Sequence, residues 1–292
     1  MSKNLWVVGD STLSSFDKYY LPRYGYGTKL QEYLDDEIIV KNIALSGRSS
    51  KSYTTEPEYQ TLLSGMKKDD YLIIGFGHND EKTENDRYTQ GEGDYLTQGT
   101  FAFSLYNNYI KKAQEAGCIP ILCTPIVRRS PDGKWNGQML HVTAPVGEYK
   151  GGDYPKAIRD LARQLNIALV DMTMMTKEMY DRLGADETLY LHAWPSDKAI
   201  SVDNTHTNVW GARVNAYLCL SEIKNIGVEG LSNHITGLEN DAPMPSKKKY
   251  FKPSETYKPT VFDSNLSDSK IWEKSGIWKP SVFGDIMDMP TK

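Results

Sequence analysis

Short runs of apolar residues alternate along the chain with longer segments in which apolar residues recur every three or four positions. The short runs are typical of buried strands, and the longer segments are typical of helices that bury one face. The predicted strands are Leu5–Val8, Ile38–Val40, Tyr71–Ile74, Ile119–Cys123 and Ile167–Val170. The clearest helical faces fall within residues 101–113, 157–165 and 209–220.

Strands that alternate with helices predict an α/β fold, with a parallel sheet covered on both faces and joined by right-handed crossovers. Such sheets bind ligands beyond the carboxyl ends of their strands. The residues that follow the first three strands are therefore the place to look for chemistry. These residues are Gly9–Thr12, Asn42–Ser49 and Gly75–Asp80.

The pattern changes near Asn233, after which prolines, lysines, serines and scattered aromatic residues show no helical or strand period. We therefore divide the chain into a domain over residues 1–232 and an irregular extension over residues 233–292. Disordered segments are usually poor in aromatic residues, yet the extension contains Trp272 and Trp278. We expect it to lie along the domain or along a neighbouring subunit, and the second possibility predicts a homo-oligomer.

The composition excludes several classes of protein. The 292 residues are 39% hydrophobic and 25% charged, which is ordinary for a globular protein, and the formal net charge of -4 provides no general attraction for nucleic acid. No secretion leader or membrane-spanning apolar run is found, so we expect a cytoplasmic protein, or a secreted one if a leader has been removed. Cys118, Cys123 and Cys219 have no metal-binding or redox spacing and are expected to be structural thiols.

Two segments together contain a serine and the groups that could activate it. A serine hydroxyl is a weak nucleophile, so it needs a base and a group that orients the base. Ser11 follows the first strand on a tight turn, although a helix-capping serine explains that position more simply when it is taken alone. Asp203 precedes His206 by three residues, which lets the carboxylate fix the tautomer of the imidazole. A capping aspartate beside a solvated histidine explains the same segment equally well.

Two further positions offer donors for an oxyanion. Asn79 supplies a side-chain amide, and Gly47 lets a backbone N–H approach closely where a side chain would obstruct it. Both residue types are also common in turns. Their placement after the second and third strands, beside the turn that carries Ser11, favours the catalytic interpretation.

These motifs resemble, in order, the four blocks of the SGNH (GDSL-like) hydrolases. The matching residues are Gly9-Asp10-Ser11, Gly47, Gly77-His78-Asn79-Asp80 and Asp203-Asn204-Thr205-His206. The resemblance implies a flavodoxin-like, three-layer α/β/α sandwich around a five-stranded sheet. It also implies Ser11 as nucleophile, His206 as general base and Asp203 as its orienter. The implied oxyanion hole combines the N–H groups of Ser11 and Gly47 with the side chain of Asn79, and no metal or cofactor is required.

Finer details look like the rhamnogalacturonan acetylesterase-like branch, over roughly Leu5 to Ile226. They comprise Asn42–Tyr53, Phe76–Asp80, Thr124–Arg129 and Asp203–Ala212. Thr12 replaces the leucine of the GDSL name, and Ser46 stands where a second glycine is usual. The branch implies a serine esterase that removes acetyl groups from plant cell-wall saccharides, with pectic oligosaccharides as the expected substrate.

Three alternatives stay open at this point. An acetyl xylan esterase or a general short-chain esterase would use the same motifs. A lipase should present an apolar groove or lid, and no long exposed apolar segment predicts one. A catalytically silent carbohydrate-binding protein is disfavoured because all four blocks are intact.

Several residues near these motifs are candidates for substrate binding. Arginine suits bidentate recognition of galacturonate carboxylates, although exposed arginines are common on any surface. A tryptophan shortly before Asp203 could stack on a sugar or simply pack. The candidates are Arg48, Arg128, Arg129 and Trp194. His78 is expected to hold its loop in shape, and His192 is expected to be structural.

Overall fold

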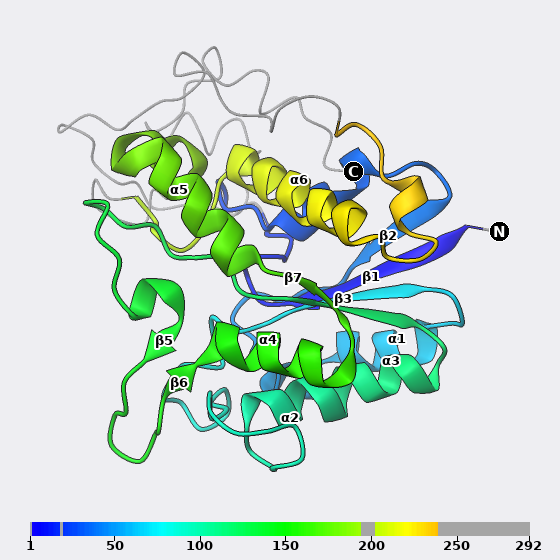
Figure 1. Cartoon of the computed structure of the whole chain (residues 1–292), viewed down its shortest axis with the longest axis horizontal. Coiled ribbons are helices and arrows are strands. Elements are labelled where there is room, and N and C mark those ends of the chain that lie inside the picture. The colour runs from blue at the N-terminus through cyan, green and yellow to red at the C-terminus, as the bar shows by residue number, and fades with distance from the viewer. Residues whose placement is uncertain (1, 18–19, 194–201, 239–292) are drawn as a thin grey trace.

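The computed structural model describes residues 2–17, 20–193 and 202–238. At its centre is a sheet of five parallel strands in the order β2-β1-β3-β4-β7 (Figure 1). The strands are β1 (Lys3–Gly9), β2 (Ile38–Asn42), β3 (Tyr71–Gly75), β4 (Ile119–Cys123) and β7 (Ala168–Val170). Each apolar run identified in the sequence forms one of them, so the predicted parallel sheet is confirmed.

Helices cover both faces of this sheet and complete the predicted three-layer α/β/α sandwich (Figure 1). One layer contains α1 (Pro57–Gly65), α2 (Phe101–Leu105), α3 (Lys111–Glu115) and α4 (Tyr154–Leu165), with a π-helical turn, η3 (Tyr106–Ile110), between α2 and α3. The other layer contains α5 (Met172–Thr188), α6 (Val209–Ile226) and the 3₁₀ helix η1 (Tyr26–Tyr33).

The two layers exist because successive side chains of a strand point to opposite faces of the sheet. In β1, Leu5 and Val7 belong to the apolar core shared with η1 and α6. Trp6 and Val8 belong to the core formed with α1, α2, α3 and α4. A strand that is apolar at every position therefore serves both cores, which is the reason these strands appear in the sequence as continuous apolar runs.

Smaller elements lie in the connections. A short antiparallel pair is formed by β5 (Val142–Thr143) and β6 (Gly152–Asp153). The remaining 3₁₀ helices are η2 (Ser52–Thr55), η4 (Gln138–Leu140), η5 (Leu189–Leu191) and η6 (Ser232–His234).

The start of α6 is fixed by two residues. The side chain of Asn208 accepts hydrogen bonds from the N–H groups of Trp210 (2.9 Å) and Gly211 (3.1 Å) and so caps the helix. A Cβ on Gly211 would lie 2.2 Å from the carbonyl oxygen of Leu191, so only glycine lets the helix approach η5 this closely. The loop over residues 203–207 therefore enters α6 in one defined position.

The chain stays packed on the domain for a few residues beyond Asn233. Ile235 is buried and forms a β-bridge with Leu34. His234 Nδ1 lies 3.0 Å from a carboxylate oxygen of Asp35. The rest of the predicted extension, residues 239–292, lies outside the described residues, as does the contact with a neighbouring subunit that was predicted for it.

Within the described ranges, no helix is long and apolar enough to cross a membrane. The same ranges contain no group of three or more His, Cys, Asp or Glu side chains placed to hold a metal ion. The three cysteines, Cys118, Cys123 and Cys219, are free and buried, as expected for thiols that serve packing.

Candidate active site

Ser11 lies in the tight turn at the carboxyl end of β1. The carboxylate of Asp10 shapes this turn, because it accepts hydrogen bonds from the N–H (2.9 Å) and the hydroxyl (2.8 Å) of Thr12. The same carboxylate accepts the N–H of His78 at 3.3 Å, which ties the turn to the segment after β3. Ser11 caps no helix here, so the simpler explanation for a serine at this position does not hold.

The Ser11 hydroxyl faces the imidazole of His206. Ser11 Oγ lies 2.9 Å from His206 Nε2, and His206 Nδ1 lies 2.8 Å from Asp203 Oδ2. An ionised carboxylate only accepts hydrogen bonds, so Nδ1 carries a proton, and Nε2 accepts the Ser11 O–H when it carries none. This arrangement lets the imidazole remove the proton from the hydroxyl and return it later.

The two oxygens of Asp203 have different partners. Oδ1 accepts the backbone N–H groups of Thr205 (2.9 Å) and His206 (3.1 Å), and Oδ2 accepts Nδ1 of His206. Burial acts to raise the pKa of Asp203, but the hydrogen bond from His206 and the charges of His206 and Arg23 outweigh it and hold the pKa well below its usual range. Asp203 thus shapes its own loop and orients the imidazole, whereas Asn208 caps the following helix.

Arg23 is a partner of Asp203 that the sequence analysis missed. Its Nε donates to Asp203 Oδ2 at 2.9 Å, and both side chains are nearly buried. The next residue, Tyr24, pairs with the end of the loop, because its N–H donates to the Thr207 carbonyl and its own carbonyl accepts the Thr207 hydroxyl, both at 2.9 Å. A lone arginine 180 residues away along the chain carries no local signal of this contact.

His192 supports the loop from beneath. Its Nδ1 lies 2.8 Å from the carbonyl oxygen of Asp203, which can only accept, so Nδ1 carries the proton and Nε2 accepts the hydroxyl of Tyr180 at 2.6 Å. Burial lowers the pKa of His192 to about 4. The ring therefore stays neutral at ordinary pH and holds the loop in shape, in line with the expectation for this residue.

Arg129 has a different role from the predicted one. It is 4% exposed, and its guanidinium donates to Thr188 Oγ1 (3.0 Å), Asn204 Oδ1 (3.0 Å) and the Ala185 carbonyl (2.7 Å). Its backbone N–H also donates to the Asn204 carbonyl at 2.8 Å. These contacts occupy all three guanidinium nitrogens, so Arg129 fastens the loop over residues 203–206 and does not face a substrate. The prediction that it binds substrate carboxylates is corrected accordingly.

The structure brings Asn79 against the segment that contains Gly47, and the residue before Asn79, His78, is hydrogen-bonded to Asp10 of the Ser11 turn. Asn79 Nδ2 donates to the carbonyl of Arg48, the residue after Gly47, at 3.1 Å. Arg87 donates to Asn79 Oδ1 at 3.3 Å, which fixes the direction of the amide. Gly47 has a φ of +78°, and no described atom lies within 4 Å of the place where a Cβ would stand. The protein thus requires glycine there for its backbone conformation.

Asp80 joins the second and third motifs. This fully buried carboxylate accepts the N–H of Ser50 (3.0 and 3.1 Å) and the hydroxyl of Thr89 (2.9 Å), and the Ser50 hydroxyl lies 2.5 Å from it. Burial raises the pKa of Asp80 to about 7, against these hydrogen bonds. The contacts hold the segment after Gly47 against the segment that contains Asn79.

The other predicted substrate-binding residues lie in three different settings. Arg48 is 40% exposed and forms an ion pair with Glu56. Arg128 is mostly buried and forms an ion pair with Glu81, beside His141. Trp194 lies outside the described residues.

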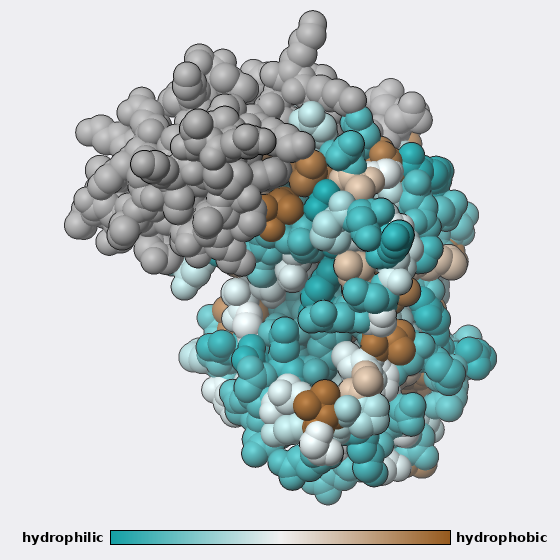
Figure 2. Space-filling view, turned by 90° about the vertical axis from the view of Figure 1, so that its left-hand side faces the viewer, coloured by the Kyte–Doolittle hydropathy of each residue, from teal (hydrophilic) through white to brown (hydrophobic). Residues whose placement is uncertain are grey.

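Figure 2 shows the side of the molecule toward which the carboxyl ends of the strands point. Its described part is mainly hydrophilic, with hydrophobic residues only in small separate patches. The large apolar side chains that are exposed among the described residues are scattered along the chain. They are Tyr20, Leu96, Val142, Val146, Met174 and Ile226. No continuous apolar groove of the kind that a long acyl chain needs is visible on the described part of this face.

Comparison with known proteins gives matches over most of the domain. Residues 7–230 match the GDSL-like lipase/acylhydrolase family. A rhamnogalacturonan acetylesterase of Bacillus subtilis is 28% identical over 245 residues, which are 80% of this chain and 95% of the relative. A probable rhamnogalacturonan acetylesterase of the same organism is 30% identical over 229 residues, which are 78% of this chain and 95% of that relative.

Solved structures share the fold. A Bacillus subtilis protein superposes with a TM-score of 0.61 at 22% identity, over 79% of this chain and 58% of its own. A catalytic mutant of an acetylxylan esterase from Geobacillus stearothermophilus gives a TM-score of 0.50 at 16% identity, over 76% of this chain and 95% of its own. At these identities the comparison establishes the architecture alone.

The ion pair between Arg23 and Asp203 predicts a pH-dependent loss of stability in Arg23→Gln. Breaking this buried pair should lower the free energy of unfolding by about 3–5 kcal/mol at pH 7. Because the folded-state pKa of Asp203 is lowered, its contribution is fully present above the unfolded-state pKa of about 3.9 and is lost as the pH falls toward the folded-state pKa. Arg23 helps to keep the folded-state pKa low, so the deficit of the variant shrinks only as the pH falls through the folded-state pKa that Asp203 has in the variant. Urea unfolding over a pH series should show a constant deficit near neutral pH that shrinks only in acid, whereas exposed Arg163→Gln should show almost none at any pH. A deficit near zero at pH 7 would contradict this account.

The neutral, buried ring of His192 predicts that His192→Asn flattens the pH dependence of stability. An asparagine amide can replace Nδ1–H as donor to the Asp203 carbonyl but cannot titrate. As the pH falls below about 6.5 the unfolded wild-type chain takes up a proton that folded His192 accepts only near its pKa of about 4, so stability is lost in this window. From pH 7 to pH 5, wild type should lose roughly 2 kcal/mol more than the variant. Parallel curves from urea unfolding would show that His192 is not the group responsible.

Proposed function

Since the chain belongs to the GDSL-like lipase/acylhydrolase family, we propose that it is a serine esterase that removes acetyl groups from plant cell-wall saccharides. The family match confirms the resemblance to the SGNH hydrolases, and with it the prediction of a carboxylic ester hydrolase. The observation that carries the proposal is the chain of hydrogen bonds from Ser11 through His206 to Asp203 at the carboxyl end of β1.

In the proposed reaction, Ser11 Oγ attacks the carbonyl carbon of an acetyl ester while His206 Nε2 takes its proton. Asp203 stabilises the imidazolium that forms. The developing oxyanion receives hydrogen bonds from the N–H groups of Ser11 and Gly47 and from the side chain of Asn79. The bond between the carbonyl carbon and the sugar oxygen then breaks, and His206 gives the proton to that oxygen, so the sugar leaves with a free hydroxyl group. A water molecule repeats the two steps on the acetyl-enzyme, which releases acetate and restores Ser11.

The proposed substrate is an acetylated pectic oligosaccharide, and the leading candidate is a fragment of rhamnogalacturonan. Support comes from two relatives at 28% and 30% identity whose names are those of rhamnogalacturonan acetylesterases. An acetyl xylan esterase or a general short-chain esterase is the second candidate, because the same catalytic groups would serve either. The mainly hydrophilic described face at the carboxyl ends of the strands favours a sugar over a lipid (Figure 2).

The proposed function is tested by acetate release from acetylated pectic, xylan and simple sugar substrates. Wild type should release acetate, and Ser11→Ala should lose almost all of this activity, by about 10⁴-fold or more, because the nucleophile is absent. Equal rates for the two proteins would overturn the esterase proposal. Aryl esters from acetate to octanoate provide a second readout. A small acyl pocket predicts a steep fall beyond acetate, and equal turnover of octanoate would favour a lipid esterase instead.

The proposed oxyanion hole predicts a specific loss in Asn79→Ala. Removing one such donor should lower kcat by about 10²–10³-fold, because the donor acts on charge that develops only in the transition state. KM for the same aryl acetate should change little. Because Asn79 also contacts Arg48, the unfolding midpoint is measured alongside, to separate a catalytic loss from a folding loss. Unchanged kcat would remove Asn79 from the oxyanion hole.

A further inference from the structure

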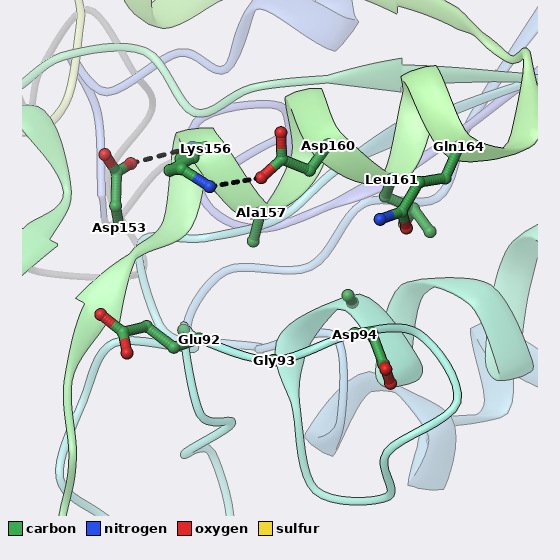
Figure 3. A pocket seen from close by; sticks show the side chains of 11 residues that line it. Glu92, Gly93, Asp94, Asp153, Lys156, Ala157, Asp160, Leu161 and Gln164 are labelled. Carbon is green, nitrogen blue, oxygen red and sulfur yellow. Dashed lines mark hydrogen bonds and ion pairs between the residues drawn. The ribbon is translucent and has the colours of Figure 1, made fainter.

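Two hollows among the described residues differ in charge. The one in Figure 3, of about 370 Å³, lies between α4 and the loop over residues 91–94. Its lining includes four carboxylates and a single ammonium group, that of Lys156, which is 2.5 Å from Asp160. A hollow of this charge repels an anionic sugar chain, and none of Ser11, Asp203 and His206 lines it.

The second hollow, of about 690 Å³, has the opposite balance. Three cationic residues and two carboxylates line it, together with hydroxyl groups of η2. The cationic residues are Arg48, Lys51 and Arg87. Ser52, Thr54 and Thr55 supply hydroxyl oxygens of the kind that bind sugars, and no aromatic residue is among the described lining residues.

This second hollow adjoins the proposed oxyanion hole. Gly47 is itself part of its lining. Arg87, which also lines the hollow, donates to Asn79 Oδ1 at 3.3 Å, and Asn79 donates to the Arg48 carbonyl at 3.1 Å. A saccharide whose acetyl group reaches Gly47 and Asn79 therefore places a neighbouring sugar unit in this hollow.

The cations of the hollow are neutralised to different degrees. Arg48 is paired with Glu56, and Arg87 with Glu84 at 2.7 Å. Lys51 has only a neutral partner, because its ammonium donates to the carbonyl of Asn85 at 2.5 Å and no ion pair to it is found among the described residues. This contact also places the Lys51 ammonium against the turn that carries Arg87. The positive charge of Lys51 is thus available to an anion that enters the hollow.

We propose that Lys51, with Arg87 beside it, binds the carboxylate of a galacturonate unit next to the sugar that carries the acetyl group. This inference rests on the proposed function and specifies its substrate as an acidic saccharide. Lysine acts as a point charge toward a carboxylate, and the planar fork of an arginine adds direction. The subsite makes the enzyme prefer acidic acetylated oligosaccharides over neutral ones.

The test removes the charge from each partner in turn. Acetylated rhamnogalacturonan oligosaccharides and their carboxyl methyl esters are compared as substrates for wild type and Lys51→Gln. For wild type, methyl esterification should lower kcat/KM by about 10-fold, the loss of one charge-assisted hydrogen bond. For Lys51→Gln it should lower kcat/KM by clearly less, roughly 3-fold, because Lys51 is absent and only Arg87 is left to meet the carboxylate. Lys51 is chosen over Arg87 because Arg87 also contacts Asn79.

Lys156→Gln is the matched control, since it removes the same charge at the acidic hollow and should keep the full 10-fold effect of methyl esterification. The subsite proposal is overturned if methyl esterification has no effect on wild type, or if it has an equal effect on wild type and Lys51→Gln. Either result can occur while acetate is still released, which leaves the proposed function standing. If wild type releases no acetate from any saccharide, the proposed function fails and the subsite fails with it.

Discussion

The carboxylate of Asp203 is the group on which the rest of the site depends. Its Oδ1 accepts two backbone N–H groups of its own loop, and its Oδ2 accepts His206 and Arg23. One buried side chain thereby sets the shape of the loop, the direction of the imidazole and the position of the chain segment around Arg23. Each oxygen has two donors, so the cost of burying the charge is offset within the site. Removing any one donor affects the other three, because they share a single rigid group.

Two more buried carboxylates bring the remaining motifs together. Asp10 connects the Ser11 turn to the segment after β3, and Asp80 connects that segment to the one after β2. Burial raises the pKa of both, and hydrogen bonds from the chain act against that effect. The carboxyl ends of three neighbouring parallel strands are thus joined by side chains of the motifs themselves. The catalytic groups are held by contacts between loops, and the apolar layers beneath supply the rigid base.

The sequence predicted the fold well and pointed to the residues that meet at the candidate site, because both leave local signals. A parallel strand buried on both faces is a continuous apolar run, and the five predicted strands are the five observed. Asp203 and His206 lie three residues apart on one loop, so their spacing was visible. Arg23 left no such signal, because its role depends on which distant segments meet. Arg129 was misjudged for the same reason, since only the structure shows that its guanidinium is buried among the groups it supports.

The distance along the chain between Ser11 and His206 has a consequence for how the protein matures. The two side chains are hydrogen-bonded to each other but are 195 positions apart in the sequence, and α6 follows the second of them. Ser11 leaves the ribosome early but meets its base only after nearly the whole domain has been synthesised and the last helix has docked. Contacts of such long range form late in folding. In the newly made chain, Ser11 therefore lacks its contact with His206 until the domain is folded, so this hydrogen bond forms only in a completed domain.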